Sequence, residues 1–568
     1  MKVIDFKDAS CRHCYKCVRN CAVKAISVQN QQARIIEEAC IHCGHCLEVC
    51  PQNAKTFASD LERILSYLKR GEQTVVSVAP SFLGDLSAPE KVAGALKRLG
   101  FSAVRETAEG AAYVTEAYGK LLRQGTMGNI ISTCCPGVND LIEKYYPVLV
   151  SEMAPVVSPV IAHGRLIKKL YGEAAKVVFL GPCIAKKQEA EGDERVAGAV
   201  DAILTFEELE QWLKREGISL EDCEEQPMDN PDPMVNRLYP IGGGILSSVQ
   251  ALCRESRYQH LAVSGVASCM ELLEEMKKGN LKDCFLELNL CEGGCVKGPV
   301  SGRARETYAL PVSRIQRKVE HRESYQGKWE EIPMAKQFAD RSIFQTEPSE
   351  AEIEELLHGI GKYSPEDELN CGACGYSTCR EKARAVYAGK AELDMCLPYA
   401  ITRAESMANV MIDQTPDLLF LIDEELEILE CSHAVERALD LSRAEITGRY
   451  LFEFVETEDV EKAIASKENI INRQTRLDSL QMHVMETVVH IRNPQSLLVM
   501  YRDITREKQE QEKNLKMKMD AVEMAQKVID RQMTVAQEIA GLLGETTAQT
   551  KVTLTKLRDT ILEESAED

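Results

Sequence analysis

The sequence predicts a multidomain protein that combines α+β and α/β segments, and three observations support this prediction. Two runs of four closely spaced cysteines lie within the first fifty residues. Short apolar runs then alternate with helical patterns up to about residue 335, as expected for buried parallel strands joined by helices. Near the C-terminus, apolar residues recur at three-four spacing, which is typical of a coiled coil.

Composition limits the classes of function. The chain has 568 residues and a net charge of −21, from 68 basic and 89 acidic side chains. Such a charge disfavours binding to phosphate backbones, so nucleic acid is not expected as a partner. No apolar run approaches the roughly eighteen residues that suggest a membrane helix, and the first residues do not form a signal peptide. We therefore expect a cytoplasmic protein that has no membrane contact.

The chain contains 22 cysteines, which the reducing cytosol would keep from forming disulfides. Their spacing indicates metal ligation instead. Eight of them form two C-x2-C-x2-C-x3-C runs that resemble two-cluster ferredoxins, in which the fourth cysteine of each run binds the other run's cluster. Residues 1–60 are thus expected to form a ferredoxin-like iron–sulfur domain for electron transfer. One 4Fe-4S cluster is assigned to Cys11, Cys14, Cys17 and Cys50, and the second to Cys40, Cys43, Cys46 and Cys21.

Residues 61–335 read as one α/β domain. Cofactors of such domains bind at the carboxyl ends of the strands, and three cysteine-bearing loops follow predicted strands here. These loops are 132–137, 181–189 and 287–298. The predicted helices are 61–70, 89–99 and 111–123, and the predicted strands are 74–79, 101–105, 129–132, 177–180 and 202–204.

The three loops, taken in this order, resemble the signature loops of the iron-only (FeFe) hydrogenases. The resemblance implies a FeFe-hydrogenase catalytic-type domain with an H-cluster, in which a 4Fe-4S cubane is joined to a diiron subcluster with CO and CN ligands. Carried over by motif, the cubane ligands are Cys135, Cys183, Cys291 and Cys295, with Cys295 also bridging to the diiron unit.

The same resemblance assigns roles around the diiron unit. Cys134 would pass protons to and from the open iron, Lys186 would hold one cyanide, and Pro80 and Ser81 would contact the other. Glu189, three residues after Lys186, is included as a catalytic candidate. Taken alone, Cys134 could equally be a small buried hydrophobic residue, and Lys186 and Glu189 could be solvated surface residues.

Several positions depart from the family pattern. Gly181 and Asn289 stand where catalytic members have methionines, and Ala154 falls on the position of a proton-relay serine. Glu116 is a candidate for a relay glutamate. Outer-shell changes at metal sites commonly cost about 10–100-fold in activity or affinity, so slow turnover is expected.

The C-terminal part contains three further segments. Residues 345–403 resemble a small four-Cys iron–sulfur domain and would hold another 4Fe-4S cluster, although zinc is an alternative for four thiolates. Residues 404–506 resemble a PAS domain, and 507–568 are expected to form a coiled-coil signalling helix without a phospho-accepting histidine. The four thiols are Cys371, Cys374, Cys379 and Cys396.

Together these features predict a sensory FeFe hydrogenase that converts H2 and protons and signals through its PAS domain. The expected partners are an electron-transfer protein, a second copy of the chain and a separate kinase or phosphatase. One alternative is a regulated hydrogenase that metabolises H2. Another is an iron–sulfur scaffold or electron-transfer protein that lacks the diiron unit.

Overall fold

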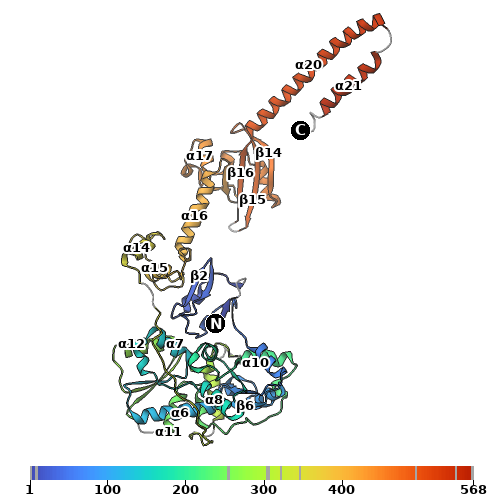
Figure 1. Cartoon of the computed structure of the whole chain (residues 1–568). Helices are drawn as coiled ribbons and strands as arrows, with labels where there is room; N and C mark the ends of the chain where they lie inside the picture. Colours follow the sequence, from blue (N-terminus) through green and yellow to red (C-terminus); the bar gives the residue numbers. More distant parts are fainter. Residues whose placement is uncertain are drawn as a thin grey trace. The chain divides into compact units, whose positions relative to one another are not determined.

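The structure is a computed structural model that describes residues 3–6, 10–252, 256–301, 307–319, 323–343, 347–492, 495–543 and 547–563. Three expected domain limits, residues 1, 345 and 568, lie outside these ranges. The chain divides into two compact units, Met1–Tyr399 and Ala400–Asp568, and each is treated by itself (Figure 1). No helix within the described residues is both long enough and apolar enough to cross a membrane.

The first unit begins with a small cysteine-rich α+β segment. This segment contains one antiparallel hairpin, a second antiparallel pair of strands and two short helices. The elements are β1 (Ile4–Phe6), α1 (Lys16–Asn20), β2 (Ile26–Gln29), β3 (Gln32–Ile35), α2 (His45–Glu48) and β4 (Lys55–Phe57).

The α/β part contains two parallel sheets. A four-stranded sheet has the order β6-β5-β8-β9, and a three-stranded sheet has the order β10-β11-β7. Every residue of β5 and of β11 is buried, as expected for strands covered on both faces. The strands are β5 (Thr74–Val78), β6 (Ala103–Glu106), β7 (Ile130–Ile131), β8 (Lys176–Gly181), β9 (Ala202–Thr205), β10 (Gln259–Ser264) and β11 (Cys284–Asn289).

Helices join these strands, so the predicted alternation is confirmed with shifts of a few residues at element ends. The division into two sheets was not predicted, because strand pairing leaves no local mark in the sequence.

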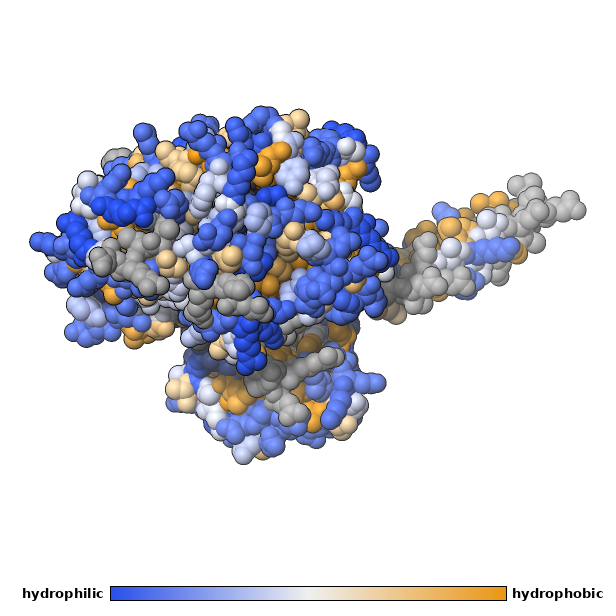
Figure 2. All heavy atoms as spheres, turned by 90° about the horizontal axis from the view of Figure 1, so that it is seen from below, coloured by the Kyte–Doolittle hydropathy of each residue, from blue (hydrophilic) through white to orange (hydrophobic). Residues whose placement is uncertain are grey.

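On the face seen in Figure 2, hydrophilic residues cover most of the surface and apolar ones are scattered. The helices are α3 (Leu61–Lys69), α4 (Phe82–Asp85), α5 (Val92–Arg98), α6 (Thr107–Gln124), α7 (Pro136–Tyr145), α8 (Pro159–Tyr171), α9 (Ala185–Lys187), α10 (Phe206–Arg215), α11 (Gly244–Leu252), α12 (Val266–Lys277) and α13 (Ala309–Lys318).

The segment after α13 does not leave the α/β part at once. Val157 donates its N–H to the carbonyl of Met334, and Lys336 donates its own to the carbonyl of Pro155, at 2.9 and 3.2 Å. The four-cysteine segment follows, with α14 (Glu350–His358) and α15 (Cys379–Tyr387) packed on each other. Its small apolar core consists of Ile353, Leu357, Ile360, Ala383 and Cys396.

The second unit is built around a five-stranded antiparallel sheet of order β13-β12-β16-β15-β14. Its core includes Phe420, Ile428, Val488 and Tyr501, which are almost fully buried. The elements are α16 (Leu397–Gln414), which begins in the first unit, β12 (Leu418–Ile422), β13 (Ile428–Cys431), α17 (His433–Leu439), α18 (Arg443–Ile446), α19 (Glu458–Ser466), β14 (Ile470–Leu477), β15 (Met482–Arg492) and β16 (Gln495–Asp503).

Two helices complete the second unit, α20 (Thr505–Leu543) and α21 (Thr547–Glu563). The predicted long helix is therefore present, and α21 folds back against it (Figure 1). Several apolar side chains of α20 stay exposed in the single chain, among them Leu515, Met519 and Ile539.

Candidate metal-cluster site

A cavity of about 100 Å³ lies in the α/β part. Its lining brings together all five cysteines that the sequence assigned to this region. Pro80, Ser81 and Lys186 also line it, together with Phe179 and Asn289. The cysteines are Cys134, Cys135, Cys183, Cys291 and Cys295.

The fold explains why these thiols converge. Cys135 is the N-cap of α7 after β7, Cys183 follows β8, and Cys291 follows β11. Pro80 and Ser81 follow β5. Because β5 and β8 belong to one parallel sheet and β7 and β11 to the other, the carboxyl ends of both sheets supply the cavity.

The wall of this cavity packs closely against the segment that carries the N-terminal cysteines. A Cβ added at Gly137, in the first turn of α7, would lie 3.0 Å from the carbonyl of Ile41 and 2.6 Å from the Leu290 side chain. Lys144 and Tyr145 each donate a 2.6 Å hydrogen bond, to the carbonyls of Cys40 and Ala39 respectively. Gly137 therefore allows the ferredoxin-like segment to pack against the cavity wall.

The donor set suits an iron–sulfur cofactor. Burial raises the pKa of the Cys134 thiol to about 12 and that of Cys183 to about 11. It raises the pKa of Cys291 and Cys295 as well. The thiols are therefore protonated until iron binds, and binding must release their protons. No three His, Cys, Asp or Glu side chains in the described ranges are placed to hold a single metal ion; a cubane instead takes one thiolate on each of four irons.

The hydroxyl of Ser81 is a second indication of a ligand in the cavity. Ser81 is fully buried, and its Oγ has no hydrogen-bond partner. A buried hydroxyl without a partner costs free energy, commonly about 1–3 kcal/mol. A bound group that accepts a hydrogen bond from Ser81 would remove this cost.

Lys186 and Glu189 form a buried ion pair, and Lys186 lines the cavity. Lys186 Nζ donates to Glu189 Oε2 at 2.8 Å and to the carbonyl of Cys134 at 3.0 Å. Burial would lower the pKa of Lys186, but the Glu189 carboxylate outweighs it and the net pKa is raised. The interpretation of these residues as solvated is therefore wrong: Lys186 presents a buried ammonium to the cavity.

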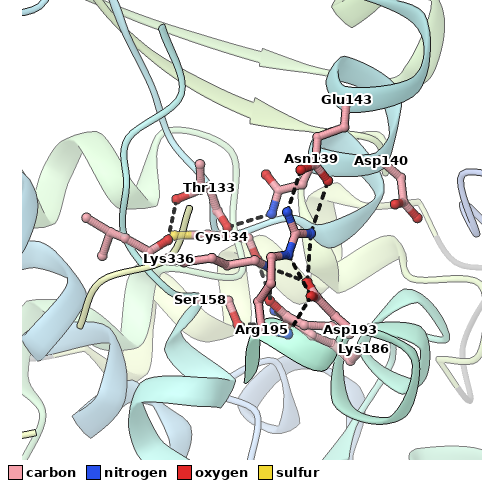
Figure 3. Close-up of polar contacts among 12 residues, drawn as sticks. Thr133, Cys134, Asn139, Asp140, Glu143, Ser158, Lys186, Asp193, Arg195 and Lys336 are labelled. Atoms are coloured by element: carbon pink, nitrogen blue, oxygen red, sulfur yellow. Dashed lines mark hydrogen bonds and ion pairs between the residues drawn. The ribbon is translucent and has the colours of Figure 1, made fainter. Parts of the chain in front are cut away.

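Other polar and charged side chains, among them Ser158 and Lys336, contact this ion pair (Figure 3). Ser158 Oγ donates to Glu189 Oε2 at 2.8 Å, and Lys336 Nζ lies 3.7 Å from Glu189 Oε1 and 2.8 Å from Asp193. Sequence analysis missed Lys336, because this residue lies 147 positions after Glu189 in a segment that reads as a polar linker.

Cys134 contacts polar groups as well as the apolar core. The Tyr118 hydroxyl lies 3.3 Å from Cys134 Sγ and 3.4 Å from Thr133 Oγ1. Thr133 Oγ1 donates to the carbonyl of Ala154 at 3.1 Å. Cys134 thus lines the cavity and has a hydroxyl neighbour, which a merely space-filling cysteine does not need.

At two positions that depart from the family pattern, Gly181 and Asn289, a neighbouring side chain matches the changed residue. A Cβ at Gly181 would lie 2.6 Å from the Phe179 ring, so Phe179 occupies the space beside this glycine. Asn289 Nδ2 donates to Glu287 Oε1 at 3.2 Å. Glu287 is fully buried, accepts from the N–H groups of Gly243 and Leu246, and has a pKa that burial raises to about 7.

Glu116 does not reach the cavity. It is a partly exposed residue of α6 that forms an ion pair with Arg123 at 3.1 Å. Ala154 is fully buried and offers no hydroxyl. Neither of the two positions considered for a relay therefore places a hydroxyl or a carboxylate at the cavity.

The N-terminal cysteines gather in two groups. Cys11, Cys14, Cys17 and Cys50 line a small cavity of about 20 Å³. Cys21, Cys40, Cys43 and Cys46 are close enough to one another to influence each other's pKa. The structure thus brings the fourth cysteine of each run to the other run's group, as the assignment requires.

The four C-terminal thiols also line one small cavity of about 20 Å³, beside the buried ammonium of Lys382. Burial lowers the pKa of Lys382, and Cys396, Cys374 and Cys379 partly oppose this effect. A nearby ammonium favours thiolates, which both a cluster and zinc require.

Comparisons with protein families assign the parts of the chain. Residues 72–299 match the C-terminal domain of the iron only hydrogenase large subunit. Residues 10–54 match the 4Fe-4S dicluster domain, 367–398 a putative Fe-S cluster and 406–504 the PAS fold.

Individual relatives are distant. Iron hydrogenase 1 of Clostridium pasteurianum is 24% identical over 310 residues, or 44% of this chain, which spans about half (53%) of that relative. The nuclear prelamin A recognition factor of Danio rerio is 23% identical over 357 residues, covering 51% of this chain and 72% of that protein. A solved structure of apo FeFe hydrogenase HydA1 from Chlamydomonas reinhardtii is 17% identical, covers 50% of this chain and all of the other, and has a TM-score of 0.41.

The thiol-lined cavity thus lies inside the part of the chain that the hydrogenase family matches. A dicluster iron–sulfur segment precedes it, and a putative Fe-S segment and a PAS fold follow. The chain is therefore a multidomain protein with a FeFe-hydrogenase-like domain over residues 72–299, accompanied by a dicluster iron–sulfur segment, a putative Fe-S segment and a PAS fold.

Proposed function

We propose that this chain is a sensory FeFe hydrogenase, which oxidises H2 slowly and reversibly and reports the result through its PAS fold. One observation supports this most strongly. The cavity combines four cubane-type thiols with a buried ammonium, a partnerless buried hydroxyl and a fifth thiol, namely Lys186, Ser81 and Cys134. A protein that only held a cubane would not need these three groups.

The residues present fit the implied cofactor. Cys135, Cys183, Cys291 and Cys295 would hold the cubane, and Cys295 would also hold the diiron unit. Lys186 Nζ and Ser81 Oγ are hydrogen-bond donors suited to cyanide nitrogens. When bound, the diiron unit would supply the iron at which H2 is converted to two protons and two electrons.

Cys134 is the residue that would move the proton. Because burial raises the pKa of its thiol to about 12, Sγ keeps a proton near neutral pH and can donate or regain it. The Tyr118 hydroxyl is a hydrogen-bond neighbour of Cys134 Sγ, whereas Ala154 offers no hydroxyl and Glu116 forms its ion pair away from the cavity. Proton exchange through the positions of Ala154 and Glu116 would then need water, which supports slow turnover.

The second unit favours a sensor over a production enzyme. Residues 406–504 match the PAS fold, and α20 leaves apolar side chains exposed in one chain. A second copy of the chain would cover this stripe, giving a parallel homodimer. Output would then be conformational and read by a separate kinase or phosphatase. Light scattering at micromolar concentration should show a dimer, and a monomer would contradict this part.

The first alternative is a hydrogenase that metabolises H2 and is merely regulated by the second unit. The second is an iron–sulfur protein without a diiron unit. This second candidate is supported by the similarity to the nuclear prelamin A recognition factor. That similarity has nearly the same sequence identity as the similarity to iron hydrogenase 1.

H2 uptake by the matured protein separates these functions. We expect measurable turnover that is on the order of a hundredfold or more below a production hydrogenase, given several changed outer-shell residues. Cys134→Ala should lower it further, whereas Cys223→Ala, at a buried cysteine away from the cavity, should not. Turnover equal to that of a production enzyme would favour the regulated hydrogenase, and none at all would favour the protein without the diiron unit.

A further inference from the structure

The four-cysteine segment packs directly on the ferredoxin-like segment, although about 350 residues separate them in the sequence. Val28 of β2 donates its N–H to the carbonyl of Lys390 at 2.9 Å. The Glu392 carboxylate accepts from the N–H groups of Asn30 and Gln31, at 2.6 and 3.2 Å. These two residues form the turn of the β2–β3 hairpin, so the contact fixes the hairpin's position.

Two cations of the ferredoxin-like segment complete the contact. Lys24 Nζ donates to the carbonyls of Gly375, Val18 and Arg19, at 2.9, 3.1 and 3.2 Å. Arg19 donates to the carbonyls of Gly372 and Ala373, at 3.3 and 3.0 Å. Both cations therefore hold the loop that contains Cys371 and Cys374.

Tyr376 is buried at this contact, with the Lys24 ammonium over its ring. The residue is 3% exposed, and its hydroxyl has no hydrogen-bond partner. Cys21 and Cys374 both pack on the apolar cluster that contains Tyr376, so the phenol lies near a cysteine of each group. Beside it, a Cβ at Gly375 would be 3.0 Å from the Val18 side chain, at a φ of +94° that favours glycine.

The Cys21 group also faces the hydrogenase-type cavity. Cys43, from the same group, lines a neighbouring pocket together with Cys291, which also lines that cavity. Cys21, Cys46 and Cys374 all pack on one apolar cluster that includes Val18, Tyr376 and Met395. The group of Cys21, Cys40, Cys43 and Cys46 thus lies between the cavity and the four-cysteine segment.

From these contacts we propose that the Lys24–Tyr376 interface is an intramolecular electron-transfer junction. One electron leaves the reduced cluster held by Cys21, Cys40, Cys43 and Cys46 and reduces the oxidised cluster held by Cys371, Cys374, Cys379 and Cys396. The inference rests on the proposed function, because H2 oxidation supplies the electrons, two for each H2. Lys24 and Arg19 are positioning residues that keep the two clusters close.

The junction gives the four-cysteine cluster a role in the sensor. Cys396 directly precedes α16, the helix that leads into the second unit. One ligand of the four-cysteine cluster is therefore the residue that immediately precedes this helix. A structural docking surface would need the same hydrogen bonds but not a cluster on each side of Tyr376.

The test uses the full chain with its clusters and two charge-reversing variants. Lys24→Glu should open the junction by replacing three donated hydrogen bonds with repulsion. Arg19→Glu is a milder change at an exposed residue, in case Lys24→Glu does not fold. Arg34→Glu, an exposed cation of β3, is the matched control.

The first readout is electron paramagnetic resonance of dithionite-reduced protein, which does not need H2 activity. We expect magnetic interaction between the two reduced clusters in the unchanged chain and in Arg34→Glu. We expect it to be lost in Lys24→Glu and weakened in Arg19→Glu, at unchanged iron content. Its absence from the unchanged chain, or its full retention in both junction variants, would overturn the proposal.

The second readout is freeze-quenched reduction by H2. The four-cysteine cluster should become reduced together with the ferredoxin-type clusters in the unchanged chain and at least tenfold more slowly in Lys24→Glu. Equal rates would overturn the junction. If H2 reduces no cluster at all, the proposed function fails, and the dithionite measurement alone decides the junction.

Discussion

Two of the thiol sites in the first unit, the hydrogenase-type cavity and the four-cysteine site, differ in how much of their geometry the protein supplies. The cavity with Cys135, Cys183, Cys291 and Cys295 lies at the ends of strands from two buried sheets. The site around Cys374 lies on loops beside a core of five residues, and Cys371 is exposed. The first site is therefore shaped by the fold, whereas the second depends on its metal, as small domains with little core commonly do.

Removing ligands should show this contrast most strongly. At four cysteines per cubane, the sixteen assigned thiols should bind about sixteen irons, and Cys374→Ala should reduce this to about twelve. The same variant should expose residues 347–399 to limited proteolysis, because burial by this core alone stabilises little. Cys183→Ala should lose a similar amount of iron yet leave the α/β part resistant.

Iron analysis and protease mapping after anaerobic reconstitution measure both effects, with Cys223→Ala as the control. Persistent protection of 347–399 in Cys374→Ala would contradict the comparison. Zinc found there at one per chain would replace the fourth cluster.

The buried ion pair of the cavity gives the next largest effect. Lys186→Met leaves Glu189 buried with only Ser158 and a more distant Lys336. Removing one partner of a buried pair costs about 3–5 kcal/mol, and Lys336 should keep the loss near the lower value. Urea unfolding of the cluster-free protein measures it. Lys169→Met, at an exposed lysine of α8, should change little, and Lys186→Met/Glu189→Gln should recover part of the loss.

If Lys186→Met and Lys169→Met destabilised the protein equally, the cavity would not be organised by this pair before the cofactor binds.

Glu287 should make the stability of the α/β part depend on pH. Its pKa is about 7 in the folded chain because of burial, against an ordinary value of 4.5. Between these values the unfolded chain binds fewer protons than the folded one, so the Glu287 contribution to stability falls as pH rises from about 4.5 to 7 and is level above that. The total change is about 3 kcal/mol.

Urea unfolding at several pH values, with Glu287→Gln subtracted, isolates this contribution. A difference that stays constant from pH 5 to 8 would show that Glu287 does not titrate as its burial predicts.

The smallest expected effect concerns Gly181. Gly181→Met would force the new side chain against Phe179, and such overpacking costs about 1–3 kcal/mol. Phe179→Ala/Gly181→Met should be more stable than the sum of the single changes, because each side chain occupies the other's space. Strict additivity in thermal unfolding would mean that the two positions do not share that space.

The sequence was sufficient for the features that leave a local pattern. Cysteine spacing predicted which N-terminal thiols gather, and the resemblance to the FeFe hydrogenases implied the group of thiols that lines the cavity. Buried apolar runs such as 74–79 and 177–180 predicted the strands that carry the loops. The sequence could not predict contacts between distant segments. Lys336 reaches Asp193 and the neighbourhood of Glu189 from a segment without a motif, and Lys24 holds a loop about 350 residues away.

The sequence also did not reveal that neighbouring side chains compensate for two of the changed residues in the cavity region. Gly181 looked like a loss of bulk, but Phe179, two residues earlier on the same face of β8, occupies that space. Asn289 looked like an isolated polar change, but it bonds Glu287 two residues earlier on β11. Residues on the same face of a strand can exchange volume or polarity, and a motif read position by position does not reveal this.

Infrared spectroscopy of the matured chain tests the central claim most directly. The claim is that Lys186, Ser81 and Cys134 surround a diiron unit with carbonyl and cyanide ligands. The account predicts carbonyl and cyanide bands that shift under H2, with the cyanide bands displaced in Ser81→Ala because that variant loses the hydroxyl donor. Absence of these bands from a matured protein that contains all its iron–sulfur clusters would contradict the account.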